Sequence, residues 1–285
     1  MDARFLKSVI AVVETGSIAN AARVEHVSAA AVSQRIKAME THFGFDLFYR
    51  VGHTVMPTSA CIDLLPRLRR IVNEMRLLPG DVDCRGLSGN LRLGIIPSQV
   101  SPEFVATLTR IGCQCPDIHI SLTQNASRTL YDTLISGELD AVIIAAPVFD
   151  VPKHVNLVAL KEEPLVLISR APIKKSIRET LMTEAYIESR PDVFVENPAK
   201  NYLQDQGLEI APIFDTNSVH TIAMLVREGV GVSLVPAWRG IDSIDLHCAQ
   251  TPVNPTSYFR KIVLLTSRFS GRPNMFEKLL EVLVV

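Results

Sequence analysis

The stretch from Ser28 to Phe43, with the sequence SAAAVSQRIKAMETHF, constrains the fold of this chain more than any other. Its apolar residues Val32, Ile36, Met39 and Phe43 follow one another at steps of four, three and four residues. This spacing places them on one face of an α-helix. Ser28 stands where an N-cap residue belongs, and alanines, which are good helix formers, follow it. The pattern therefore predicts an amphipathic helix with a defined start.

The opposite face of this predicted helix is polar and compact. It carries Ser33, Gln34 and Lys37 near Ala30, with Arg35 beside them. Alanine allows the backbone to approach DNA, serine and glutamine can hydrogen-bond to base edges, and lysine and arginine can contact phosphates. An ordinary surface helix also has a polar face. This pattern alone is therefore compatible with both a recognition helix and a solvated one.

The segments that precede this helix complete a helix-turn-helix. A first apolar stripe ends near Gly16, and Ser17 can cap a second short helix over Ile18–Val24. A turn over residues 25–27 then leads to the helix that Ser28 begins. Two short helices, a tight turn and a third helix with an exposed polar face define a helix-turn-helix.

Two short extended segments follow, separated by a turn at Gly52-His53. Tyr49-Arg50 precedes the turn and Val55-Met56 follows it, so we expect a two-stranded wing. Arg50 and His53 would then approach phosphates or the minor groove. The winged helix-turn-helix is predicted to occupy residues 1–58.

A long helix is predicted after the wing, over about residues 59–78. Its apolar stripe has seam-like spacing and consists of Ile62, Leu65, Leu68, Val72 and Met75. A lone exposed helix with such a stripe requires a partner, and we expect that partner to be the same helix of a second copy. Residues 79–89 are rich in Gly, Pro, Asp and Ser, which predicts a hinge.

Residues 90–285 alternate short apolar strands with helices, beginning with a strand at Leu91–Ile96 and a helix at Pro102–Gly112. Such alternation predicts a parallel sheet with helices on both faces, here in two halves of about 90–146 and 147–265. Small ligands bind beyond the carboxyl ends of the strands in such sheets. The polar residues predicted at these ends and in the neighbouring loops are Ser98, Gln99, Asn125, Arg128, Thr129, Arg190, Thr216 and Asn217. Their hydroxyls, amides and arginines would suit a small ligand that carries a carboxylate.

Composition limits the classes of protein that remain. The formal net charge is −1, with 21% charged and 47% apolar residues, which is typical of a globular protein and can hide a local basic surface. The first residues contain no apolar signal-peptide core, and no apolar run reaches the ~18 residues of a membrane span. Five scattered cysteines suit reduced thiols. We therefore expect a cytoplasmic protein without a membrane partner.

No catalytic or metal-binding pattern is found in the sequence. The seven histidines form no HExxH motif, and neither a nucleophile elbow nor a phosphate loop is present. Gly229-Val230-Gly231 lacks the third glycine of a dinucleotide fingerprint and is more simply a helix C-cap and turn. Cys113 and Cys115 leave a redox pair and two ordinary thiols both open. The sequence thus predicts neither an enzyme nor a bound cofactor or metal.

Residues 16–50 carry a series of small motifs at fixed spacing. They are Gly16-Ser17, Ala21-Ala22, Val27-Ser28, Val32-Ser33 with Ile36, Glu40, Gly44, and Leu47-Phe48 with Arg50. In this series the chain resembles LysR-type transcriptional regulators. It departs from that family at Ala29-Ala30, where Gln-Ser or Gln-Pro is usual, and in the segment 57–61, where PTSAC stands in place of Leu-Thr-x-x-Gly. Because the usual glutamine is a common base contact, the operator preference of relatives does not transfer to this chain.

The C-terminal region resembles the same family in the segments 89–94, 136–140 and 225–236. The resemblance implies an α/β protein in which a winged helix-turn-helix and a linker helix precede a two-lobed effector domain like a periplasmic binding protein. It implies a regulator that binds double-stranded promoter DNA as a homodimer or homotetramer and responds to a small molecule bound between the lobes. Effector, target genes, operator sequence and direction of regulation stay open.

The residues predicted to meet DNA lie on the recognition helix and the wing. They are Ser28, Ala29, Ala30, Ser33, Gln34, Arg35, Lys37, Arg50 and His53. We expect Ser33 and Gln34 at base edges, and Arg35, Lys37 and Arg50 at phosphates together with Arg23. Two alternatives compete with a regulator. A solute receptor would fit the C-terminal part but not the helix-turn-helix, and an enzyme on a doubly wound sheet would require a catalytic constellation.

Overall fold

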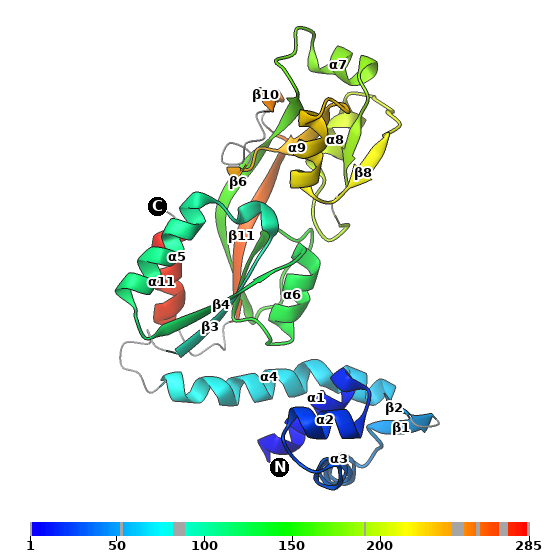
Figure 1. The fold of residues 1–285 in the computed structure, drawn as a ribbon, viewed down its shortest axis with the longest axis vertical. Coiled ribbons are helices and arrows are strands. Elements are labelled where there is room, and N and C mark those ends of the chain that lie inside the picture. Colours follow the sequence, from blue (N-terminus) through cyan, green and yellow to red (C-terminus); the bar gives the residue numbers. More distant parts are fainter. Residues whose placement is uncertain are drawn as a thin grey trace.

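The computed structural model describes residues 2–51, 54–81, 89–190, 192–240, 248–254, 257–267 and 273–283. They form an N-terminal helical module, one long helix and an α/β domain with two lobes (Figure 1). The long helix runs beside the base of the α/β domain, and the module lies at one end of that helix (Figure 1).

The N-terminal module has the order helix, helix, helix and hairpin. Its elements are α1 (Ala3–Thr15), α2 (Ile18–Val24), α3 (Ala29–Phe43), β1 (Phe48–Val51) and β2 (Thr54–Pro57). Ser17 and Ser28 cap α2 and α3 by accepting hydrogen bonds from the backbone N–H groups of Asn20 and Ala31. Gly44 ends α3 in the left-handed region at φ 79°, which a residue with a side chain rarely adopts. The predicted helix-turn-helix and wing are confirmed.

The apolar stripe of α3 faces the core of this module. Val32 and Met39 are buried with Val9, Val12 and Leu47. Burying one large aliphatic side chain contributes roughly 1.5–3 kcal/mol. The cluster therefore fixes the rotation of α3 about its axis, and its polar face points outward.

The long helix α4 (Ser59–Asp81) continues beyond the predicted end at residue 78, so residues 79–81 of the predicted hinge are helical. Residues 82–88 of that predicted hinge lie outside the described residues. The predicted apolar stripe does not lie on one exposed face. Leu68 is buried against the module, and Val72 packs there in part, whereas Ile62 and Met75 are 55% and 46% exposed. The exposed face also includes Ile71. Part of the stripe thus holds α4 onto its own module, and another part is open to a second chain.

The first lobe is built on three parallel strands. They are β4 (Ile118–Gln124), β3 (Gly89–Ile95) and β5 (Ala141–Ala145), in that spatial order. The short helix η1 (Pro97–Gln99) follows β3, and the larger helices of the lobe are α5 (Pro102–Gln114), α6 (Ser127–Ile135) and α11 (Pro273–Leu283). All five residues of β5 are buried, because helices cover both faces of the sheet (Figure 1).

Two long strands connect the lobes and correct one expectation. β6 (Val155–Ser169) pairs antiparallel with β11 (Phe259–Ser267), and β11 pairs antiparallel with β5. The sheet is therefore mixed, and the prediction of a parallel sheet was wrong beyond its first three strands. The two strands extend between the lobes in opposite directions, β6 from the first lobe toward the second and β11 back again (Figure 1). The chain crosses between the lobes on continuous backbone, and we refer to β6 and β11 as the connecting strands.

The second lobe surrounds the far half of β6. Its strands are β7 (Ile187–Ser189), β8 (Phe214–Thr216), β9 (Ser233–Pro236) and β10 (Ala249–Pro252), and its helices are α7 (Ile177–Thr183), α8 (Pro198–Asp205) and α9 (Val219–Arg227). β9 and β10 pair antiparallel with β6, and β7 pairs parallel with β8. No single helix among the described residues is long and apolar enough to cross a membrane; α1 and α2 pass that test only as a pair bent by 120°.

Candidate functional site

The outward face of α3 presents a group of short polar and small side chains. Ser28, Ala29, Ala30, Ser33, Gln34 and Lys37 are all exposed, as predicted. Among the described residues, the side chains of Ser33, Gln34 and Lys37 make no hydrogen bond or ion pair. The face therefore has donors and acceptors that no intramolecular contact occupies.

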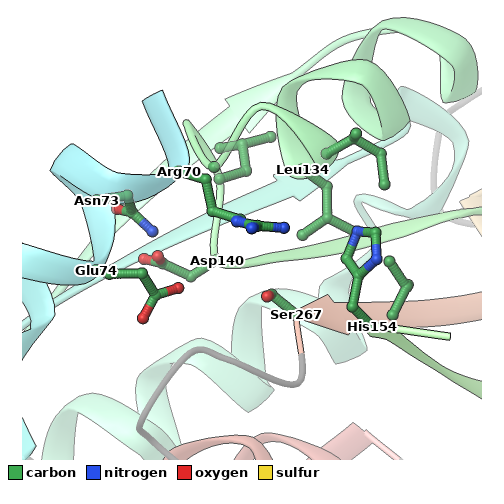
Figure 2. A pocket seen from close by; sticks show the side chains of 11 residues that line it. Arg70, Asn73, Glu74, Leu134, Asp140, His154 and Ser267 are labelled. Carbon is green, nitrogen blue, oxygen red and sulfur yellow. The ribbon is translucent and has the colours of Figure 1, made fainter. Parts of the chain in front are cut away.

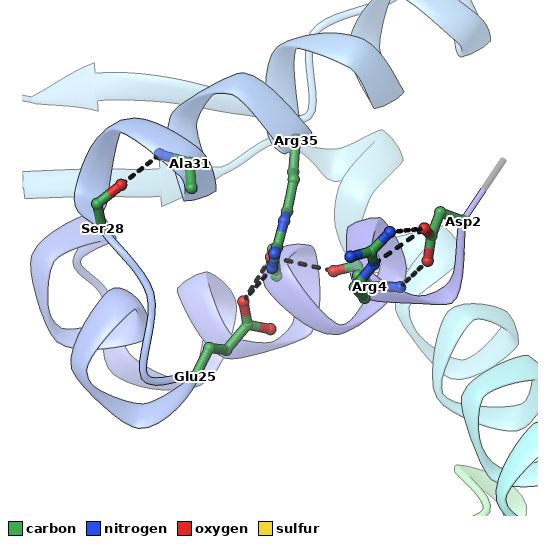
Figure 3. A network of polar contacts seen from close by, with 7 residues as sticks. Asp2, Arg4, Glu25, Ser28, Ala31 and Arg35 are labelled. Carbon is green, nitrogen blue, oxygen red and sulfur yellow. Dashed lines mark hydrogen bonds and ion pairs between the residues drawn. The ribbon is translucent and has the colours of Figure 1, made fainter.

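Arg35 does not belong to this face, which corrects its predicted role at a phosphate. Its Nη1 lies 3.0 Å from Glu25 Oε2 and donates to Ser8 Oγ at 3.1 Å, while Ser8 donates to the same carboxylate oxygen at 2.6 Å (Figure 3). The side chains of Arg35 and Glu25 are only 17% and 13% exposed. The guanidinium thus ties α3 to α1 and to the end of α2.

Replacing Arg35 by alanine is expected to weaken DNA binding through loss of stability. Removing one partner of a largely buried ion pair leaves Glu25 uncompensated and costs about 3 kcal/mol. The melting temperature of the module, followed by circular dichroism, should fall in Arg35→Ala and stay unchanged in Lys37→Ala, because Lys37 is exposed. An unchanged melting temperature in Arg35→Ala with weakened DNA binding would instead restore the phosphate contact.

The wing offers one further cation in the described part of the chain. Arg50 is exposed on β1, where it faces Val55 of β2 in the antiparallel register. His53, predicted at the turn of the wing, lies outside the described residues. Arg23, at the end of α2, is also exposed. Cations at these positions add to the charge that Lys37 supplies on α3.

The second site is a cavity of about 630 Å³ between the two lobes. The carboxyl ends of β3, β4 and β5 open into it from the first lobe, and those of β7 and β8 from the second. This is the arrangement expected of ligand sites in open α/β sheets. Of the predicted residues, Ser98, Asn125, Arg190 and Asn217 line the cavity.

Four predicted residues lie elsewhere. Arg128 and Thr129 are exposed on α6 outside the cavity lining, and Arg128 lies 3.9 Å from Asp132 on the same helix. Thr216 is not part of the lining either, and its Oγ1 accepts a hydrogen bond from the N–H of Ser218. Gln99 faces a second cavity of about 370 Å³ beside α5. One residue position separates Ser98, which lines the cavity, from Gln99, which does not, and strand-end reasoning does not resolve such a difference.

Arg260 on β11 is the cation that strand-end reasoning missed. Its Nε and Nη2 donate to Glu163 Oε2 at 2.9 and 2.5 Å, and Nη2 also donates to Ser98 Oγ at 3.1 Å. Glu163 is 2% exposed and also accepts from Gln99 Nε2 at 2.9 Å, with Lys161 Nζ 3.2 Å away. The buried carboxylate therefore fixes Arg260 in the wall of the cavity. The only sequence signal was a basic residue shortly before an apolar strand.

Other side chains at the cavity are polar without being charged. Ser127, Asn197, Ser218 and His220 all line it. The His220 ring lies 5.7 Å from the Trp238 ring, centroid to centroid. Burial lowers the pKa of the His220 imidazole, so this side chain is neutral at pH 7. No group of His, Cys, Asp or Glu within the described ranges could hold a metal ion.

Two sequence families match this chain, one on each part. The family described as "LysR substrate binding domain" matches residues 85–284, and "Bacterial regulatory helix-turn-helix protein, lysR family" matches residues 3–61. The first match covers more than half of the chain. The chain belongs to the LysR family. It is a DNA-binding transcriptional regulator with an effector-binding domain, and not an enzyme.

Known LysR regulators resemble the chain over nearly its full length. A "Probable nitrogen assimilation transcriptional activator" of Synechococcus elongatus is 26% identical over 260 residues, which cover 88% of this chain and 83% of the relative. A full-length OxyR from Pseudomonas aeruginosa superposes with a TM-score of 0.72 at 20% identity, covering 100% and 98% of the two chains. Full-length CbnR in complex with its target DNA gives 0.68 at 21% identity and 99% coverage of both. These structures show that the fold is that of complete LysR regulators.

In this LysR regulator several polar contacts join the linker helix α4 to the first lobe. Arg69 of α4 pairs with Glu14 of α1 at 2.9 Å and with Glu138 after α6 at 2.5 Å. Arg92 of β3 donates to Asn73 of α4 and pairs with Asp140 at 2.8 Å. Figure 2 shows the small cavity beside these contacts, where Arg70, Asn73 and Glu74 of α4 face His154 and Ser267 of the lobe. The helix thus contacts both functional parts of the chain.

Proposed function

We propose that α3 enters the major groove of promoter DNA and that the wing contacts the adjacent backbone. Ser33 and Gln34 would meet base edges, with Ser28, Ala29 and Ala30 at the closest approach. Lys37 and Arg50 would contact phosphates, together with Arg23 and the predicted His53. The observation that carries this proposal is the exposed, unoccupied polar face of α3 on a module whose core fixes its direction.

The same proposal assigns a role to each remaining part. Residues 1–58 bind DNA, α4 pairs with its counterpart in a second chain, and residues 90–285 bind the effector. The exposed apolar side chains of α4, Ile62, Ile71 and Met75, support the pairing. A homo-oligomer would place two recognition helices in successive major grooves. The site of action is the cytoplasm, where promoter DNA is accessible.

We place the effector in the cavity between the lobes. Ser98, Asn125, Arg190 and Asn217 line it, and Arg260 and Ser127 join them. Effector binding would draw on residues of both lobes and so change their separation about β6 and β11. Because α4 contacts the first lobe through Arg69 and Asn73, such a change would reach the DNA-binding module. The coupling requires that effector and DNA each alter the affinity for the other.

The double substitution of Gln34 and Lys37 by alanine tests the DNA-binding role. A base contact contributes about 1–3 kcal/mol, so affinity for the promoter region should fall by about fivefold or more. Loss of one phosphate contact should also reduce the salt dependence of binding by about one unit of slope. Fluorescence anisotropy with the region upstream of the protein's own gene, at two salt concentrations, measures both effects.

A matched control substitutes Lys200 and Gln204 by alanine. Both residues are exposed on α8, in the second lobe, and the change in side-chain type is the same. This control should bind DNA as the unmodified protein does. Equal affinities for the two double variants would contradict the assignment of α3.

A further inference from the structure

The two walls of the inter-lobe cavity differ in charge. The wall formed by the first lobe and the connecting strands is rich in hydrogen-bond donors, and the wall formed by the second lobe is acidic. A ligand that binds between them meets both walls at once. The asymmetry therefore restricts the chemical class of the effector.

The donor-rich wall combines three features. Ser98 is 6% exposed at the cavity surface, and its hydroxyl donates to no other described residue. Arg260 uses Nε and Nη2 on Glu163 and Ser98, while Nη1 makes no hydrogen bond to a described residue. Helix α6 begins beside them with Ala126 at its N-cap and no side-chain cap, so its first backbone N–H groups remain available. Together these groups favour a carboxylate.

The helices of the second lobe that border the cavity do not offer the same site. Asn197 caps α8 by accepting from the N–H of Lys200, and Ser218 caps α9 by accepting from the N–H of Thr221. Each of these side chains thus occupies one of the backbone N–H groups that the helix start would otherwise offer to a ligand. An anion would find fewer free donors on this wall.

Carboxylates dominate the charge of the second wall. Asp192 and Glu196 line the cavity, and neither has a cationic side chain within 4.0 Å among the residues that the structure describes. Arg190, the cation of this wall, is already paired with Glu188 and Asp215 at 3.5 and 3.1 Å. His220 is neutral at pH 7 and adds no positive charge. This wall therefore favours a cationic group.

We propose, on the basis of the proposed effector function, that the ligand of this cavity is a small zwitterion of the amino-acid class. Its carboxylate lies against Ser98, Arg260 and the start of α6, and its ammonium group faces Asp192 and Glu196. A dicarboxylate would direct its second charge at two carboxylates. A simple amine would leave Arg260 Nη1 and the Ser98 hydroxyl without an acceptor among the described residues. The zwitterion satisfies both walls.

The test is calorimetric titration of the full-length protein with matched ligands. The twenty common amino acids are compared with their des-amino carboxylates and decarboxylated amines, for example leucine with 4-methylpentanoate and 3-methylbutylamine. At least one amino acid should bind about tenfold or more tightly than both of its analogues, because a charge-assisted hydrogen bond contributes about 1.5–3 kcal/mol. Glu196→Gln and Asp192→Asn should reduce that preference for the amino acid over the des-amino carboxylate. Glu209→Gln, an exposed site outside the cavity lining, should leave it unchanged.

The results separate this inference from the function on which it rests. If des-amino carboxylates bind as tightly as amino acids, or if Glu196→Gln and Asp192→Asn leave the preference unchanged, the zwitterion is excluded while the cavity remains an effector site. If no amino acid binds, the zwitterion is likewise excluded. The regulatory function is measured independently of the amino-acid titrations. The measurement is the affinity for promoter DNA, and the change in that affinity when fractions of a cell extract are added. Loss of the response in Ser98→Trp, which fills the cavity, would still support that function.

Discussion

Replacing Glu163 by glutamine should lower the free energy of unfolding by about 3–5 kcal/mol, because it leaves a buried guanidinium without its counter-charge. The carboxylate is 2% exposed and the Arg260 side chain 14% exposed. One oxygen accepts from Nε and Nη2 of Arg260, and the other accepts from Gln99 and lies 3.2 Å from Lys161. A glutamine has an amide nitrogen in place of one carboxylate oxygen. Its N–H groups would face either Arg260 or the pair Gln99 and Lys161, which also donate. Urea unfolding followed by the fluorescence of Trp238, the single tryptophan of the chain, measures the change.

The neighbouring residue provides a matched control. Glu162 precedes Glu163 on β6 but is exposed, so Glu162→Gln makes the same chemical change in water. Its effect should stay within about 0.5 kcal/mol. If the free energy of unfolding falls equally in the two variants, the ion pairs of Glu163 contribute no more to stability than a surface charge does. In the expected case, Glu163→Gln should also weaken effector binding, because Arg260 loses the partner that fixes it in the cavity wall.

The N-terminal module could be predicted from sequence because its signals are local. Periodicity and capping serines located α2 and α3, and each capping serine accepts a hydrogen bond from a backbone N–H within one turn of its own position. The second lobe is different. Of strand β6, the sequence pattern indicates only the apolar run over residues 165–169, because the first half alternates exposed and part-buried positions and has no continuous apolar run. The antiparallel return of β11 depends on long-range pairing, which no local pattern encodes.

The candidate sites divide in the same way. The exposed face of α3 follows from helical spacing, so most of its residues were located correctly. Arg35 was expected on this face, but one helical position separates an exposed cation from one that reaches Glu25 across the turn. Arg260 was missed because it reaches Ser98 from the other end of the chain. Sequence can thus locate a strand end, but which side chains meet there depends on tertiary packing.

Gly231 illustrates a constraint that only the packed structure reveals. Sequence predicted a helix C-cap and turn at 229–231, and Gly229 does adopt a left-handed φ of 80° after α9. Gly231 is needed for a different reason, which is close approach. A Cβ atom at this position would lie 2.2 Å from the carbonyl oxygen of Ala185 and 2.9 Å from its carbonyl carbon. That oxygen accepts the N–H of Val232 at 2.8 Å, so it cannot retreat without losing this bond.

Gly231→Ala is therefore expected to destabilise the second lobe by about 3 kcal/mol or more, since the clash involves backbone and relaxes only by separating the chain at 185–187 from residue 232. Trp238 is buried in the adjoining core with Val235 and Ile222, so its fluorescence should report an earlier unfolding transition in urea. Gly112→Ala is the control: this glycine is exposed inside α5 with no atom within 4 Å of the added Cβ, and alanine there should stabilise the chain by about 0.5–1 kcal/mol. If Gly231→Ala unfolds at the same urea concentration as the unmodified protein, the approach of residues 185 and 231 is looser than the structure shows.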